Sequence, residues 1–465
     1  MSDSVTLYRG RFFNPVTPTR TDFLSDGLLA VDGAGRIVAF GEADRIVGEY
    51  PGAEVVDLRP ALIIPGLIDT HAHLPQYDVV AMEGDELLSW LERYIFPAEA
   101  RFAEASHARR VARQFWREML AHGTTTGVVY ATVHQYATNI AFEEAERAGV
   151  RAVIGKVMMD RHSPPALLEE TERSLRESEE LCQTWHGRDG RLFYAFSPRF
   201  APTCSRRLMQ AVARLARRYD AYIQTHLAEN LDELAWVAQL FPEAAHYTDV
   251  YARAGLLGPR TLLAHAIYLS EAEYELLAAT NTRLCHCPRS NFFLKSGLMD
   301  LARAVERGLR VGLGTDVGAG PSLSLLHEMA AACFASKARY AWERFYTERL
   351  ASLEADFAAL GEAGRDLFER LKAALELGDT VTVVDPSRAL YLATLGGAEV
   401  LGMEGHLGSF AVGKEADFVA LDVTVLDPAR GHEPDRRPQD LLSQLVYRGD
   451  RQAVQGVWVR GHKKG

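Results

Sequence analysis

The chain has 465 residues, of which 48% are hydrophobic and 24% are charged, and its formal net charge is −11 at pH 7. These are ordinary globular values, and they argue against a disordered, fibrous or membrane-embedded chain. The acidic charge also argues against a nucleic-acid partner, which would need a broad basic surface, and the length allows two or three domains.

The N-terminal residues, MSDSVTLYRGRFF, carry no basic region followed by an apolar run. No stretch of the sequence approaches the roughly 18 apolar residues that a membrane-spanning helix needs. The five cysteines are odd in number and scattered, so we expect reduced thiols and no disulfide framework. These features predict a cytoplasmic protein with no membrane partner.

Short apolar runs bounded by glycine-rich turns occur at both ends of the chain. They span residues 5–13, 27–41, 407–422 and 453–465. Their composition is typical of β-strands and hairpins. We expect residues 1–65 and 404–465 to pair into one small β domain of the sandwich type.

Between these ends, eight apolar runs rich in β-forming residues alternate with segments of helical periodicity. The runs span residues 61–73, 124–134, 151–160, 192–200, 221–230, 261–270, 282–290 and 310–320. This alternation is typical of a parallel sheet covered by helices. The sequence therefore predicts an α/β fold, a (β/α)₈ barrel of the TIM type over residues 66–403.

A long segment follows the last of these runs, at residues 342–377. Its apolar residues have the spacing of an amphipathic helix; they are Phe345, Leu350, Leu353, Phe357 and Leu360. We interpret the segment as a helical insertion in the barrel. A lid, a dimer contact and a surface decoration all fit this pattern.

Histidines and acids stand near the ends of the predicted strands, where a barrel of this type builds its active site. They are His71, His73, His226, Glu229, His265 and Asp316. His71 and His73 lie two residues apart, so their side chains point to the same face of a strand and can chelate one ion. Taken alone, each residue also fits a structural role: a polar strand end for the histidines, a helix first turn for Glu229 and a turn for Asp316.

The convergence of these groups on one rim favours a catalytic metal site over six unrelated structural roles. His71, His73, His226 and Asp316 are suitable ligands for one divalent ion, with zinc as the first expectation and iron as the alternative. A hydrolytic ion keeps an open position, where the pKa of water falls from about 15.7 to about 7.

Two further groups are suited to handling protons beside such an ion. Glu229 lies close to a predicted ligand without being needed as one, which suits an acid and base that exchanges protons with water and substrate. Its pKa should be raised by a closed site, because it must carry a proton to the substrate. His265 can orient water and stabilise developing negative charge.

Five motifs resemble the amidohydrolase superfamily, and together they extend over nearly the whole chain. They are PGLIDTHAH at 65–73, GTTT at 123–126, HLAE at 226–229, LAH at 263–265 and GTDVGAG at 314–320. The resemblance implies that His71, His73, His226 and Asp316 bind metal. It also implies that Glu229, His265 and Asp316 transfer protons and orient water. Superfamily members with two metals carry a bridging lysine after the fourth strand, where this chain reads SPRF, so one ion is expected.

Three segments are similar to the guanine deaminases within that superfamily, at residues 71–102, 155–160 and 197–205. The resemblance implies hydrolysis of guanine, a free purine base, to xanthine and ammonia, with water as the second substrate, and implies a homodimer. It places Gln76, Arg199 and Phe200 against the purine. Gln76 and Arg199 also fit a second interpretation, as ordinary polar residues at the rim of the barrel.

Other functions remain open at this point. A related amino heterocycle such as a pterin would need the same rim, and a barrel that has lost catalysis would keep the fold alone. The loop at 286–297 carries Arg289 and Lys295, where relatives have smaller or neutral residues, so substrate choice is open. The P-C-x-x-C and H-x-E signature of deaminases that act on nucleic acid does not occur in the sequence, which favours a free base.

Overall fold

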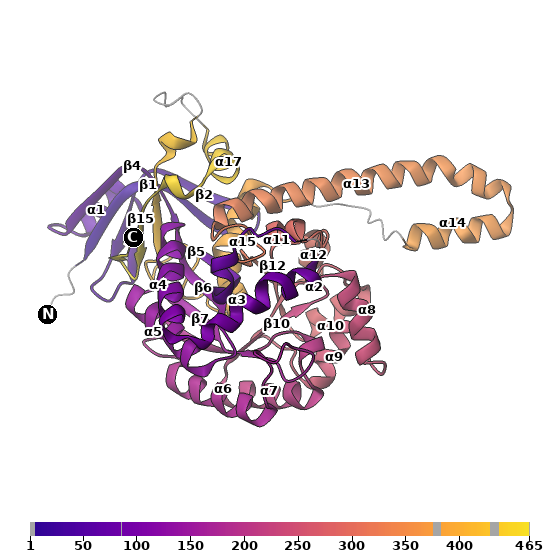
Figure 1. The fold of residues 1–465 in the computed structure, drawn as a ribbon. Coiled ribbons are helices and arrows are strands. Elements are labelled where there is room, and N and C mark those ends of the chain that lie inside the picture. The colour runs from indigo at the N-terminus through magenta and orange to yellow at the C-terminus, as the bar shows by residue number, and fades with distance from the viewer. Residues whose placement is uncertain (1–4, 85, 375–382, 428–436, 465) are drawn as a thin grey trace.

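The computed structural model describes residues 5–84, 86–374, 383–427 and 437–464. Figure 1 shows two β-sheet regions with helices packed around the larger one, and a pair of helices that reaches away from it. The larger sheet carries the polar groups singled out above. The smaller sheet lies beside it and contains both ends of the described chain.

Eight neighbouring parallel strands form the larger sheet. They are β5 (Leu67–His73), β6 (Thr124–Tyr130), β7 (Arg151–Gly155), β9 (Leu192–Pro198), β10 (Tyr222–Leu227), β11 (Thr261–His265), β12 (Arg283–His286) and β13 (Val311–Leu313), with the short β8 (Val157–Met158) paired to β9. Each strand falls within one of the eight predicted runs. Nearly every strand residue is buried, as expected for strands that are covered on both faces. The predicted (β/α)₈ barrel is confirmed.

The barrel closes where the chain leaves β13 and meets β5. The Thr70 hydroxyl donates to the Leu313 carbonyl over 2.9 Å. Beyond it, the Asp316 N–H donates to the His71 carbonyl over 2.8 Å, and the His73 N–H donates to the Val317 carbonyl over 2.7 Å. The bonds that close the barrel therefore also bring residue 316 beside residues 71 and 73.

One set of helices surrounds the barrel strands, with apolar residues turned inward. They are α4 (Ala105–Ala121), α5 (Gln135–Ala148), α6 (Thr171–Trp185), α7 (Arg206–Tyr219), α8 (Leu231–Leu240), α9 (Tyr247–Ala254), α10 (Glu271–Ala279), α12 (Leu301–Glu306), α15 (Pro386–Ala393) and α16 (Leu395–Leu401). In α4, for example, Val111, Phe115 and Met119 recur at helical spacing and are all buried in the main core. The chain then turns into β6 through Gly123, whose φ of +84° suits glycine.

The other helices, apart from the insertion described below, lie in the connections between these elements, and most of them are short. They are α1 (Ala43–Glu49), η1 (Leu74–Val79), α2 (Leu87–Trp90), the π-helix η2 (Leu91–Ile95), α3 (Phe96–Ala100), η3 (Arg101–Ala103), η4 (Ala201–Thr203), α11 (Pro288–Phe293), η5 (Val423–Leu426), α17 (Pro438–Arg448) and η6 (Arg451–Ala453). Those from η1 to α3 follow β5 directly. They therefore lie next to the barrel end that holds the functional groups.

The smaller sheet combines strands from both ends of the chain, as predicted. In spatial order these are β16 (His462–Lys463), β15 (Val454–Val459), β14 (Phe418–Leu421), β4 (Glu54–Pro65), β1 (Thr6–Thr17), β2 (Arg20–Val31) and β3 (Ile37–Glu42). β1 and β4 are parallel, and the other neighbours are antiparallel. Tyr8, Phe418 and Trp458 meet in its core, where the last two rings stack at 4.7 Å.

The predicted insertion forms the outer part of α13 (Leu325–Ala359) and all of α14 (Glu362–Ala374). The two helices fold back on each other, with Phe357 and Phe368 in contact at 5.7 Å, and extend away from the barrel (Figure 1). The apolar side chains of the predicted amphipathic pattern are only partly buried, since Phe345 is 57% exposed. Residues 375–377 of the prediction lie outside the described residues. None of the described helices is long and apolar enough to cross a membrane.

Candidate active site

A pocket opens at the carboxyl ends of the barrel strands. It is lined by His73, Gln76, Leu87, Trp90, Leu91, Arg199, Phe200, His226, Glu229, His265, Leu294, Asp316 and Ala319. This set contains every predicted site residue except His71, which contacts His73 and Asp316 directly. In the part of the chain that the structure describes, α13 and α14 contribute no lining residue, so a lid role for them receives no support.

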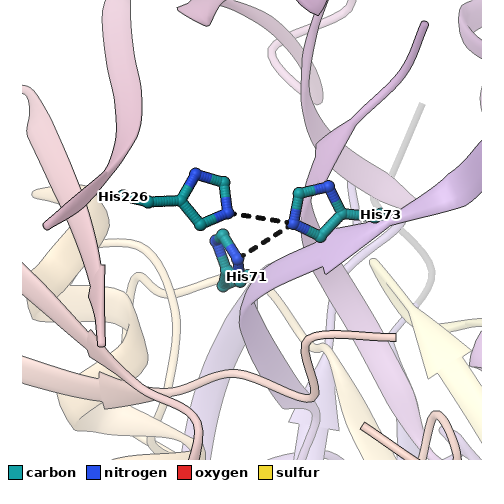
Figure 2. A group of neighbouring side chains, drawn as sticks. All are labelled: His71, His73 and His226. Carbon is teal, nitrogen blue, oxygen red and sulfur yellow. Dashed lines mark hydrogen bonds between the residues drawn. The ribbon is translucent and has the colours of Figure 1, made fainter. Parts of the chain in front are cut away.

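Three imidazoles point toward one another at the centre of this site (Figure 2). The Nε2 atom of His73 lies 3.2 Å from Nε2 of His71 and 3.2 Å from Nε2 of His226. Asp316 completes the group, because its Oδ1 lies 3.2 Å from Nε2 of His71 and 3.3 Å from Nε2 of His73. All four side chains are buried or nearly so.

The spacing of these donor atoms fits a bound cation. Ligand atoms about 2.1 Å from a tetrahedral ion lie about 3.4 Å from one another, close to the separations seen in this cluster. The Nδ1–H of His226 donates to the Arg199 carbonyl over 2.7 Å, which leaves Nε2 unprotonated and available as a ligand. A second overlapping set of candidate ligand atoms comprises His71, His265 and Asp316.

The charge state of the cluster also fits a cation. Burial lowers the pKa of His73 to about 4. Burial, reinforced by the neighbouring histidines, lowers the pKa of His226 well below its ordinary value. Burial alone would raise the pKa of Asp316, but hydrogen bonds from His71 and His73 outweigh it and hold that pKa well below the usual range. Neutral imidazoles beside a carboxylate are the form in which these groups bind metal.

The backbone is strained where it presents these groups. His265 and Asp316 have φ values of +72° and +47°, a region that residues other than glycine rarely occupy. Gly314 lies directly against β5, since a Cβ at this position would be 2.7 Å from Cβ of His71. The GTDVGAG motif therefore contains glycine here because the chain passes so close to β5.

Asp69 ties β5 to the turn that carries Asp316. Its carboxylate accepts hydrogen bonds from the Thr315 hydroxyl over 2.6 Å, from the Thr315 N–H over 3.0 Å and from the His71 N–H over 3.2 Å. Burial raises the pKa of Asp69 to about 6. Sequence analysis missed this residue, although it lies within the PGLIDTHAH motif.

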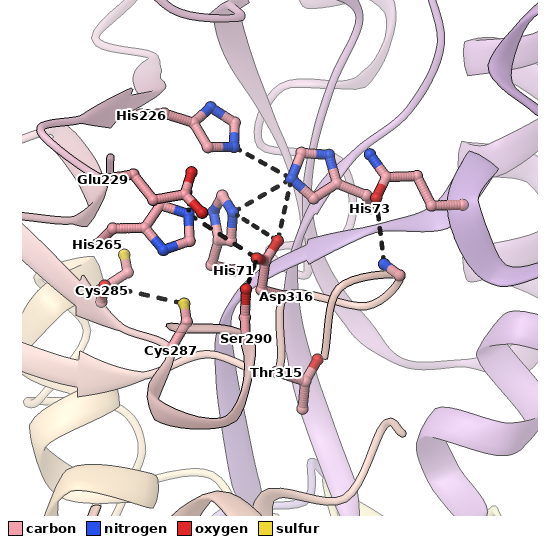
Figure 3. Close-up of polar contacts among 12 residues, drawn as sticks. His71, His73, His226, Glu229, His265, Cys285, Cys287, Ser290, Thr315 and Asp316 are labelled. Carbon is pink, nitrogen blue, oxygen red and sulfur yellow. Dashed lines mark hydrogen bonds and ion pairs between the residues drawn. The ribbon is translucent and has the colours of Figure 1, made fainter. Parts of the chain in front are cut away.

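The segment after β12, which begins with α11, supports three of the predicted site residues, and Figure 3 shows one of these contacts, between Ser290 and Asp316. These contacts join Ser290 Oγ to Asp316 Oδ2 at 2.5 Å, Asn291 Oδ1 to His265 Nδ1 at 3.0 Å, and Ser296 Oγ to Glu229 Oε1 at 3.3 Å. Sequence analysis considered this loop only for its two cations. Neither cation is among the pocket-lining residues of the described chain: Arg289 donates to the Ser322 hydroxyl over 2.8 Å, and Lys295 is exposed.

Glu229 is buried at the edge of the pocket, with Oε2 3.4 Å from Nε2 of His265. Burial raises the pKa of Glu229 well above its ordinary value, and the negative charges of Asp316 and Glu233 raise it further. The carboxyl group therefore holds a proton more readily than an exposed glutamate does. A buried acid that can be neutral near pH 7 can donate its proton to a ligand in the pocket.

The opposite side of the pocket carries Arg199, Gln76 and a carboxylate that sequence analysis missed, Glu99. Nη1 of Arg199 donates to both oxygens of Glu99, over 2.8 and 2.6 Å. Nε2 of Gln76 donates to Glu99 Oε1 over 3.0 Å. Apolar side chains, including that of Trp90, form the walls between the two sides. Glu99 and Trp90 both lie in the segment 71–102 on which the resemblance was based.

Lys156, between β7 and β8, is fully buried and forms an ion pair with Glu169. Its ammonium also lies 3.3 Å from the Ser174 hydroxyl at the start of α6. The lysine is therefore bonded to side chains outside the histidine cluster.

Comparison with known proteins identifies relatives over the full length of the fold. The sequence matches the Amidohydrolase family over residues 62–355 and 345–464. It is 37% identical to the guanine deaminase of Escherichia coli over 443 residues, which cover 94% of this chain and 91% of that protein.

Comparison with solved structures also identifies a guanine deaminase as similar. The structure of guanine deaminase from C. acetobutylicum with bound guanine in the active site is similar, with a TM-score of 0.86, 30% identity and 99% of each chain covered. An adenosine deaminase from Xanthomonas campestris with bound zinc is similar with a TM-score of 0.80 and 25% identity, over 98% of this chain and 92% of that one. Both the sequence match and these relatives extend over most of the chain, and the chain belongs to the amidohydrolase family.

Proposed function

We propose that this protein catalyses the hydrolytic deamination of guanine to xanthine and ammonia. The observation that carries the proposal is one pocket that brings together a candidate cation-binding cluster, a readily protonated glutamate and, beside them, an Arg199–Glu99–Gln76 group. Such a pocket suits a flat heterocycle with apolar faces and polar edges. Relatives of similar length that carry the name guanine deaminase support the choice of substrate.

We infer that His71, His73, His226 and Asp316 hold one divalent ion, with zinc as the proposed metal and iron as the alternative. Such an ion supplies positive charge that makes a water molecule more acidic and more nucleophilic at neutral pH. The donor set does not separate the two metals, because imidazole and carboxylate suit both. Metal analysis of freshly purified protein decides between them.

Glu229 is the proposed proton carrier. It accepts a proton from the attacking water, whose oxygen adds to the amino-bearing carbon of guanine. It then passes this proton to the ring nitrogen next to that carbon and carries the proton of the added hydroxyl to the amino group, so that the carbon–nitrogen bond breaks and ammonia leaves while the ring carbon becomes a carbonyl. His265, oriented by Asn291, and Asp316, held by Ser290, are placed to orient the water and to stabilise charge on the added oxygen.

Arg199, Gln76 and Phe200 are the proposed contacts to the purine. Because Nη1 of Arg199 is engaged by Glu99, its other N–H groups are the donors left for an oxygen acceptor on the ring. Phe200 lies in the pocket wall and offers apolar area or its backbone.

A pterin deaminase is the rival within the same chemistry, and a barrel without catalysis is the rival outside it. The test is ammonia release from guanine, isoxanthopterin and adenine, measured side by side with the metal content of the same sample. We expect guanine to be preferred. Preferred turnover of a non-purine would replace the substrate, and no turnover by metal-loaded protein would favour a binding protein.

Two further expectations stay predictions: a homodimer and a cytoplasmic location. Mass photometry of the purified chain tests the first. Cell fractionation with an antibody to the chain tests the second.

A further inference from the structure

Glu99 is a buried carboxylate that reaches the pocket only through its neighbours. It is 1% exposed, lies in α3 and is not among the pocket-lining residues. Both of its oxygens accept hydrogen bonds from Arg199, and one also accepts a hydrogen bond from Gln76. One glutamate thus contacts two polar side chains that line the pocket, Arg199 and Gln76.

We propose that Glu99 is a positioning residue that determines specificity: by balancing the charge of Arg199 and fixing Gln76, it makes the pocket select neutral oxo-heterocycles and reject anionic ones. This inference rests on the proposed function and deepens it. Among the excluded ligands is the deprotonated form of the proposed product, xanthine. Glu99 would therefore favour product release as well as substrate choice.

The charge balance follows from the surroundings of Arg199. This guanidinium is buried beside the pocket and lies 5.4 Å from the centre of the Phe96 ring, so it is shielded from bulk water. A buried cation without a partner attracts anions strongly, because the local dielectric constant is low. The carboxylate of Glu99, which accepts two hydrogen bonds from Nη1, balances that charge. The N–H groups that remain can still donate to a neutral carbonyl oxygen.

The orientation of Gln76 follows from two bonds at opposite ends of its amide. Its Oε1 accepts from the Gly318 N–H over 3.2 Å, and its Nε2 donates to Glu99 over 3.0 Å. A reversed amide would place Nε2 against an N–H and Oε1 against a carboxylate, and both contacts would be repulsive. Glu99 therefore fixes which atom of Gln76 offers a donor to the ligand.

The proposed product differs from the substrate in acidity. Replacement of the amino group of guanine by oxygen creates an imide N–H flanked by two carbonyls, so xanthine loses a proton more readily than guanine does. As the pH rises above neutrality, a growing fraction of xanthine is anionic. A charge-balanced pocket disfavours that anion, whereas a pocket with an unpaired arginine binds it.

The test uses competitive inhibition of guanine turnover by xanthine, relative to hypoxanthine, which lacks the imide and loses a proton less readily than xanthine does. Inhibition constants are measured at about pH 6.5 and about pH 8.5. In the wild-type enzyme we expect xanthine to weaken as an inhibitor, relative to hypoxanthine, as the pH rises. Xanthine that binds more tightly at the higher pH would overturn the proposal with no variant needed.

Variants separate charge from geometry. Glu99→Gln keeps the size of the side chain and removes its charge, so we expect xanthine to bind about tenfold more tightly relative to hypoxanthine at the higher pH. Glu99→Asp keeps the charge but shortens the side chain, so KM for guanine should rise while xanthine stays a weak inhibitor. The double variant Glu99→Gln/Arg199→Gln carries neither charge and should lose the tight binding of xanthine.

Glu144→Gln is the matched control. Glu144 is also buried and also forms ion pairs with arginines. These are Arg109, Arg113 and Arg147, which lie on α4 and α5. Its substitution should leave the xanthine to hypoxanthine ratio unchanged. If Glu99→Gln and the control behave alike at both pH values, the proposal is wrong. If the wild-type protein does not deaminate guanine, the proposed function fails, and direct calorimetric binding of both purines still tests the role of Glu99.

Discussion

Ser290 donates a 2.5 Å hydrogen bond to Oδ2 of Asp316, while Oδ1 of the same carboxylate contacts His71 and His73. The two oxygens therefore have different partners. A hydroxyl on one oxygen fixes the plane of the carboxylate and directs the other oxygen toward the histidines. Ser290, in the helix α11 that follows β12, thus fixes the side chain of Asp316, which lies just after β13.

Substitution of this hydroxyl tests its contribution. We expect Ser290→Ala to lower kcat for guanine by about tenfold to a hundredfold, because a hydrogen bond to a buried carboxylate and the orientation it imposes are both lost. The variant should keep its fold. Ser89→Ala, which removes a hydroxyl on α2 that donates to the Glu86 carbonyl, should have wild-type kcat. An unchanged kcat in Ser290→Ala would show that Asp316 is held without it.

Glu229→Gln tests the proton carrier. The amide keeps the size of the side chain but cannot carry a proton, so we expect kcat to fall by about a hundredfold to ten-thousandfold. Metal content and melting temperature should stay close to those of the wild type, since the four proposed ligands are intact. A near-normal rate in this variant would remove Glu229 from the mechanism.

His73→Ala tests the metal cluster. His73 lies between the other two imidazoles, so its loss removes the central ligand, and we expect both bound metal and guanine turnover to be lost. His406→Ala provides the control, because His406 is exposed on the outside of the molecule. Elemental analysis and ammonia release are measured on the same samples. Retention of metal in His73→Ala would place the ion elsewhere.

The burial of His286 leads us to expect that the free energy of unfolding decreases in acid. It is buried, and burial lowers its pKa to about 3, whereas in the unfolded chain its pKa is about 6.5. Between these values the unfolded chain binds a proton that the folded chain does not, so stability decreases as the pH falls below about 6.5. At about pH 5 this one group accounts for a loss of about 2 kcal/mol.

The urea midpoint of unfolding measures this effect. We expect the wild-type midpoint to fall between about pH 7.5 and about pH 5 by more than that of His286→Gln, which has no imidazole to protonate. The difference between the two pH values is the readout, so a general destabilisation of the variant does not affect it. Equal losses in the two proteins would contradict the assignment.

The barrel and the convergence of the candidate ligands at one rim could be predicted because their signals are local. Each strand is a short apolar run, and His71, His226 and Asp316 stand at or just beyond strand ends, which a parallel barrel brings to one rim. The sequence could not show that Asp316 also lies beside β5. That proximity depends on the hydrogen bonds that close the barrel.

The supporting residues could not be predicted, because they are ordinary polar residues whose partners lie far away in the sequence. Glu99 is 23 positions from Gln76 and 100 positions from Arg199, and Ser290 is 26 positions from Asp316. Serine, asparagine and glutamate at such sites have no distinctive spacing. Helices α13 and α14 show a different limit. The apolar pattern of their sequence predicted a helix correctly, but it could not reveal the turn between the two helices.

The most direct test of the central claim is a titration of metal-free protein with zinc, followed by guanine-dependent ammonia release and bound metal in the same samples. The proposed mechanism requires that metal-free protein be inactive. Activity should then rise in proportion to bound zinc and reach its maximum at one ion per chain, with iron as the parallel titration. Full deamination of guanine by protein shown to contain no metal would contradict the account.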